Sequence, residues 1–103
     1  MKVILKSKNN THYAQGEYDG QGIKVLKGSR INNNNTFPKM SAHIKALRND
    51  REIVSYNGCV KKDIYFSSPS AAAIFVTGRS SNGYVTWRID DKISLKKYRE
   101  HNQ

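Results

Sequence analysis

The chain has 103 residues, which is the size of one domain with a single modest core. It holds 18 Lys and Arg against 8 Asp and Glu, so its formal net charge is +10. This excess favours an acidic partner, most often nucleic acid, and argues against an inhibitor that imitates DNA, which would be acidic. The alternative is a basic surface that is solvated and has no partner.

The first half of the sequence predicts three short strands and one helix. Residues 3–5, 12–18 and 23–26 are rich in β-forming residues and are separated by Asn, Asp and Gly, which predicts an antiparallel meander. Four asparagines at residues 32–35 predict a mobile loop without a function of its own. Ser41 can cap a helix that ends at residues 49–50.

The second half predicts a strand, a capped helix, a further strand and a final helix. Residues 54–56 can pair with residues 60–66 across an Asn-Gly turn. Ser68 is a natural N-cap before Pro69, and Gly78 is a natural stop for the helix between them. An Asn-Gly turn at residues 82–83 predicts a second strand through Trp87, and a last helix follows from residue 94.

We therefore predict a single α+β domain over residues 1–103. It would have a small, mostly antiparallel sheet of five to six strands with two to three packed helices. No apolar run approaches the roughly 20 residues of a membrane span, and the N-terminus lacks the apolar region of a signal peptide. We expect a cytoplasmic protein, as a monomer or a homodimer.

Two motifs stand out in the second half. Residues 66–72 read Phe-Ser-Ser-Pro-Ser-Ala-Ala, and residues 78–83 read Gly-Arg-Ser-Ser-Asn-Gly, with Trp87 a few residues later. Together with Leu-Lys-Gly-Ser at residues 26–29, they resemble a small bacterial domain of unknown function that is often appended to GIY-YIG nucleases and restriction-modification proteins. The resemblance covers about residues 23–98.

The same motifs are similar, more distantly, to the restriction-enzyme adenine-methylase-associated (RAMA) domain. These resemblances imply a role at DNA, including modified DNA, without naming an activity. The GIY-YIG catalytic motif itself does not occur in this sequence. The chain therefore resembles the accessory domain standing alone.

The residues themselves do not predict an enzyme, a metal or a cofactor. His12, His43 and His101 fall in unrelated segments, and the adjacent carboxylates at residues 90–91 lie in an expected turn. The single Cys59 can form neither an internal disulfide nor a metal site alone. Phosphate-loop, catalytic-triad and metal-ligand spacings do not occur.

Several segments combine cations with hydroxyls or glycines and are candidates for nucleic-acid contact. Arg79 is the first choice, because a guanidinium suits a phosphate or a guanine edge, and Asn82 can read adenine or simply form the turn. The start of the helix at Ser68 offers free backbone amides that could bind an anion, although a self-satisfied cap is the favoured explanation of the motif. Ser67 and Ser70 are not needed for the cap and are therefore the better functional candidates. The candidate set is Lys27, Ser29, Arg30, Lys61, Lys62, Ser67, Ser70, Arg79, Asn82 and Arg88.

Each of these candidates has a structural alternative. At residues 27–30, the glycine at the end of a strand can let the backbone approach a phosphate, or it can simply form a turn. The lysines at residues 61–62 can contact a phosphate, or they can keep an exposed strand edge soluble. Trp87 is expected in the core, and its functional alternative is a base-stacking platform shared with Tyr84. Arg88 should point to the opposite side from Trp87 and be exposed.

The sequence thus predicts a non-catalytic DNA-binding accessory domain linked to restriction-modification or to mobile elements. The alternative is a protein–protein interaction module, or a small inhibitor, that acts on a nuclease or methylase subunit.

Overall fold

The computed structural model describes residues 1–90 and 92–101. It contains a four-stranded antiparallel sheet in the order β1 (Lys2–Lys6), β2 (Tyr13–Tyr18), β3 (Ile23–Val25) and β4 (Ile64–Phe66). The first three strands are the meander that the sequence predicts. The α+β class is confirmed, but the predicted five to six strands exceed the four in the described residues.

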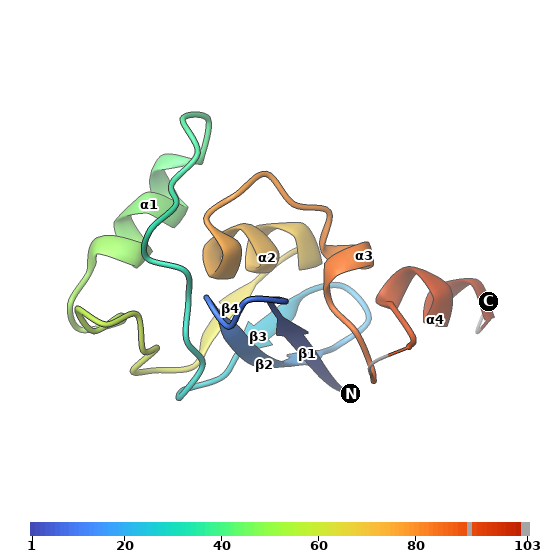
Figure 1. Ribbon diagram of the computed structural model, residues 1–103. Helices are drawn as coiled ribbons and strands as arrows, with labels where there is room; N and C mark the ends of the chain where they lie inside the picture. The colour runs from blue at the N-terminus through green and yellow to red at the C-terminus, as the bar shows by residue number, and fades with distance from the viewer. Residues whose placement is uncertain (91, 102–103) are drawn as a thin grey trace.

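Four helices accompany this sheet within the described ranges: α1 (Ala42–Asn49), α2 (Pro69–Thr77), α3 (Gly83–Thr86) and α4 (Leu95–His101). Helix α2 lies across one face of the sheet, with α1 and α3 on either side of it (Figure 1). None of these helices has the length and apolar character that crossing a membrane requires.

The helix caps follow the sequence closely. The Ser41 side chain accepts a hydrogen bond from the Ile44 amide at 3.2 Å and starts α1. The Ser68 side chain accepts from the Ala71 amide at 3.1 Å, with the proline at the first position of α2. Gly78 ends α2 at φ 73°, a left-handed conformation that favours glycine.

The core lies between α2 and the covered face of the sheet. Alternate strand residues such as Val3, Leu5 and Val25 point inward and are almost fully buried. Phe66 of β4 meets Phe75 of α2 with ring centroids 5.1 Å apart. This packing fixes the position of both ends of α2.

Two predicted strands are wrong. Residues 54–56 and 60–66 do not form a pair of strands, because Val54 and Val60 share only an isolated bridge and β4 pairs with β3 instead. Residues 83–86 form the short helix α3, because the Asn82 side chain accepts from the Tyr84 amide at 3.0 Å and acts as an N-cap. Beyond it, Arg88 forms an isolated bridge to Ile4 of the sheet.

Gly83 has a different role from that of a turn glycine. Asn82 has φ −92°, so the Asn-Gly pair does not need a left-handed residue at that position. A side chain at Gly83 would instead overlap the backbone of Pro69 and Ser70. The glycine therefore lets α3 begin directly against the start of α2.

Candidate functional site

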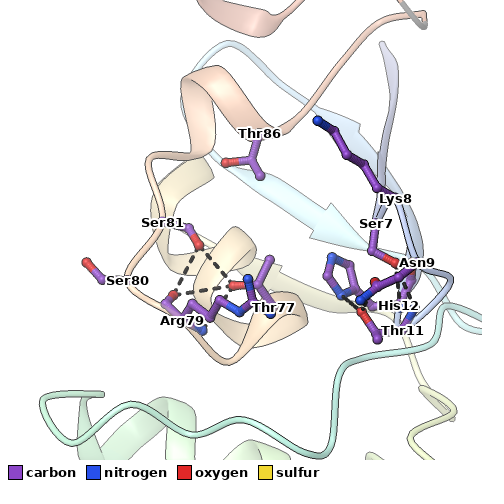
Figure 2. A pocket seen from close by; sticks show the side chains of 10 residues that line it. All are labelled: Ser7, Lys8, Asn9, Thr11, His12, Thr77, Arg79, Ser80, Ser81 and Thr86. Atoms are coloured by element: carbon purple, nitrogen blue, oxygen red, sulfur yellow. Dashed lines mark hydrogen bonds between the residues drawn. The ribbon is translucent and has the colours of Figure 1, made fainter.

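A cavity of about 510 Å³ opens between the turn that joins β1 to β2 and the segment that follows α2. Figure 2 shows the two segments facing each other across it, with Thr86 of α3 above. We call it the basic cavity; its lining residues are Ser7, Lys8, Asn9, Thr11, His12, Thr77, Arg79, Ser80, Ser81 and Thr86.

The lining of the basic cavity is polar and cationic. Of the ten described residues that line it, six carry hydroxyls, Lys8 and Arg79 supply positive charge, and none is a carboxylate. Hydroxyl, ammonium and guanidinium groups are donors that phosphate oxygens accept from. The cavity is therefore suited chemically to an anionic or strongly polar group.

The loop that carries Arg79 is held by its own hydroxyls. The Thr77 Oγ1 accepts from the Arg79 amide at 3.1 Å and lies 2.9 Å from Ser81 Oγ, which donates to the Arg79 carbonyl at 3.1 Å (Figure 2). The Arg79 side chain itself is exposed. A guanidinium on such a fixed loop loses little entropy when it contacts a ligand.

Asn35 also positions the Arg79 side chain. In the amide orientation in which both of its ends are paired, the Asn35 oxygen accepts from Arg79 Nε at 3.1 Å and from Arg79 Nη2 at 3.3 Å. The asparagine tract was predicted to have no function, and this contact gives one of its members a positioning role.

The opposite wall is the β1–β2 turn, which is tied together by Ser7. The Ser7 Oγ accepts from the Thr11 amide at 2.7 Å and from the His12 amide at 3.2 Å. His12 Nδ1 lies 3.0 Å from Thr11 Oγ1, and only 8% of the histidine is exposed. Burial, with the charges of Arg79 and Arg30, lowers the pKa of His12 below its ordinary value.

A second cavity of about 340 Å³ adjoins the first and shares Ser7, Lys8 and Thr86 with it. It adds Ile4, Lys6 and Arg88, and the described part of its lining again holds no carboxylate. We call the two cavities together the basic groove. It runs along β1, an edge strand of the sheet, where Ile4 and Arg88 exchange backbone hydrogen bonds of 2.8 Å.

The structure brings three of the predicted contact residues to this region. Arg79 lines the first cavity and Arg88 the second, and Arg88 is exposed as expected. Arg30 is near enough to influence the His12 charge, and its guanidinium donates to the Asn10 carbonyl at 2.6 Å.

Other predicted residues lie elsewhere. Lys27 lines a separate, smaller cavity, and Lys61 donates from its ammonium to the Arg51 carbonyl at 2.8 Å. Lys62 and Ser67 are exposed and line neither cavity of the groove.

Three predicted polar contacts have structural partners within the domain. Ser29 is buried, and its hydroxyl bonds both the amide and the carbonyl of Gln15. The Ser70 hydroxyl accepts from the Gly83 amide at 3.0 Å, which links α2 to α3. Asn82 caps α3 with its side-chain oxygen.

Trp87 lies in the core, as the sequence favours. It is fully buried, and its indole Nε1 donates to the Pro69 carbonyl at 3.1 Å. A ring with no exposed surface offers no platform for a base. Tyr84 is half-buried, with the Arg99 guanidinium 4.6 Å from its ring centroid, so a cation already covers one of its faces.

The turn wall of the cavity could not be predicted from the sequence. Lys8, Thr11 and His12 sit in a polar turn, and polar turns are ordinary in sequence. The C-terminal end of α2 reaches this turn because the helix packs over the sheet, and a local sequence pattern does not predict such a contact. In the described residues, no three His, Cys, Asp or Glu side chains gather where a metal ion could bind.

The fold and the groove together define a small α+β domain with a cationic groove at one sheet edge. By sequence, the chain matches the domain of unknown function DUF4357 over residues 5–99, and it belongs to this family. No curated protein and no solved structure matches it.

Proposed function

We propose that the domain binds DNA without catalysis and that the basic groove is its contact surface. The observation that carries the proposal is a continuous groove whose lining includes Lys6, Lys8, Arg79 and Arg88 and, among the residues that the structure describes, no carboxylate. The net charge of +10 supports it, since phosphate neutralisation supplies most non-specific affinity for DNA.

The biological setting is also a proposal. The resemblance to domains appended to GIY-YIG nucleases and restriction-modification proteins supports a setting beside systems that act on modified DNA. We therefore propose an accessory role that supports or counters such a system. The cytoplasm is the location that fits this role.

Binding is expected to fall steeply with salt, because the cations of the groove displace counterions from phosphates. The measurement is fluorescence anisotropy with labelled duplexes in a series of salt concentrations, using adenine-methylated and unmethylated copies of one sequence. A slope of log affinity against log salt of about −3 to −4 matches the four groove cations. Absence of binding to duplex, single-stranded DNA and RNA at low salt would contradict the proposal.

Arg79→Ala is expected to weaken binding by ~1–3 kcal/mol, the range for a specific arginine contact. The exposed side chain and its loop-internal hydrogen bonds mean that the fold should persist. Lys97→Ala and Arg99→Ala on α4 are the controls, because neither residue lines the groove. If the α4 variants lose more affinity than Arg79→Ala, the binding face lies on α4 instead.

A protein partner is the second candidate, and Tyr56 is the observation that favours it. Its side chain is 87% exposed in a tight turn, with the Arg51 guanidinium 4.9 Å from the ring centroid. Tyrosine and arginine are both enriched in protein interfaces and among the residues that dominate their binding energy. A nuclease-treated pull-down that recovers a nuclease or methylase subunit, and loses it with Tyr56→Ala, would support this candidate.

A further inference from the structure

We infer that the basic cavity receives one phosphate group of the bound nucleic acid and that His12 takes up a proton when this phosphate enters. The inference rests on the proposed function and deepens it, because it assigns the ligand group and a titrating residue within the groove.

The walls of the basic cavity present hydrogen-bond donors from two directions. Arg79 and the loop hydroxyls stand on one side, and Lys8, Thr11 and His12 stand on the other, so donors face the same space from two elements (Figure 2). Phosphate has several acceptor oxygens and is best bound by donors that converge from different directions. None of the described lining residues is a carboxylate, the group that would repel a phosphate.

The hydrogen bonds of Thr11 determine which nitrogen of the neutral His12 ring carries the proton. The Thr11 hydroxyl donates its single proton to Asn9 Oδ1 at 3.1 Å, so it can only accept from His12 Nδ1 at 3.0 Å. The neutral ring therefore carries its proton on Nδ1, and Nε2 is an acceptor. Figure 2 shows this second nitrogen directed into the cavity.

The charges that face His12 explain why it is neutral before the ligand binds. Arg79 from the loop after α2 and Arg30 from the segment after β3 both disfavour a positive charge on the ring, and Lys8 of the same turn lines the cavity beside it. Burial acts in the same direction and holds the pKa of His12 low. A phosphate in the cavity offsets these charges, and protonated Nε2 becomes a donor aimed at the phosphate.

The alternative is that His12 is a satisfied histidine that only closes the turn. In that case its ring would not respond to a phosphate in the cavity, and binding would not depend on its titration. The two interpretations differ in proton uptake, which can be measured directly.

The test is an NMR titration of the three histidines in the free protein, with a short duplex, and with inorganic phosphate. His43 and His101 are exposed and serve as internal controls. We expect the His12 pKa to rise by about one unit with the duplex and by more than those of the controls. A one-unit rise corresponds to about tenfold tighter binding at pH values below the His12 pKa than above it.

Two variants separate the possible outcomes. His12→Gln keeps a polar side chain of similar length but cannot titrate, so duplex affinity should lose this tenfold pH dependence, whereas His43→Gln should retain it. A pKa rise with inorganic phosphate alone supports a site for a single phosphate, and a rise with duplex only supports a site for a backbone phosphate.

This experiment distinguishes failure of the inference, which is seen in the His12 titration, from failure of the proposed function, which is seen in duplex binding. Duplex binding with an unshifted His12, or with pH dependence that persists in His12→Gln, overturns the inference and leaves DNA binding intact. Loss of duplex binding at every pH and at low salt overturns DNA binding, and an unshifted His12 in inorganic phosphate then overturns the phosphate site as well.

Discussion

Trp87→Ala is expected to destabilise the domain by ~3–5 kcal/mol, the cost of removing a large buried side chain. The indole has no exposed surface, and it also donates a hydrogen bond to Pro69 at the start of α2. A domain of this size is stabilised by about 5–15 kcal/mol in all, so the variant should lose a large fraction of its total stability.

Urea unfolding followed by circular dichroism measures the effect, because the substitution removes the only tryptophan. In the unsubstituted protein the emission of Trp87 should be blue-shifted and resistant to quenchers. Tyr56→Ala is the matched aromatic control, since that ring is 87% exposed and should cost less than about 0.5 kcal/mol. A stable Trp87→Ala protein that loses only binding would contradict the core assignment.

The elements that the sequence predicts well are those decided within a few residues. The caps of α1 and α2 depend on Ser41, Ser68 and Gly78, and each residue does locally what its chemistry favours. The β1–β2–β3 meander follows from short strands joined by turns. Such signals survive folding because tertiary contacts do not oppose them.

The failures have a common physical cause in contacts between distant segments. Val85 and Trp87 have the composition of a strand, but Gly83 allows close packing on Pro69 and the N-cap at Asn82 starts a helix there. Tertiary contact overrides β propensity at this point. The Asn-Gly motif was predicted to form a turn between strands, whereas in the structure Asn82 caps α3 and Gly83 allows its close contact with α2.

The candidate site divides in the same way. Arg79 could be predicted because it lies in a distinctive motif after a helix stop, and the structure places it in the basic cavity. His12 and Lys8 could not be predicted as site residues, because the cavity that they line is closed by segments 65 residues or more away in the sequence. Ser29 was predicted as a donor for phosphate, and folding buries it against Gln15 instead.

The burial of Arg48 could not be predicted from the helical pattern of the sequence. A cation near the end of a short helix normally faces water, but Arg48 is only 5% exposed. Its guanidinium donates to the carbonyls of Phe75 at 2.5 Å, Asn32 at 2.6 Å and Asn35 at 2.7 Å. Burial lowers the pKa of Arg48, and the group nevertheless stays charged because arginine is not deprotonated in proteins.

This cluster joins α1, the asparagine tract and the last turn of α2. Arg48→Ala is therefore expected to destabilise the domain by about 3–5 kcal/mol, since it removes three charge-assisted hydrogen bonds and leaves buried carbonyls unpaired. Lysine cannot replace the planar fork, so Arg48→Lys should recover only part of the loss. Lys45→Ala, one turn earlier on α1, is the control and should change stability by less than about 0.5 kcal/mol.

The same contacts connect stability to the proposed binding groove. Arg48 holds the Asn35 carbonyl, and the Asn35 side chain in turn accepts from Arg79. If this chain of contacts positions Arg79, Arg48→Lys should weaken DNA binding even where it remains folded, and adding Arg79→Ala should then cost less than it does alone. A double-mutant cycle by anisotropy measures the difference, and strictly additive losses would show that Arg48 supports the fold without positioning the groove.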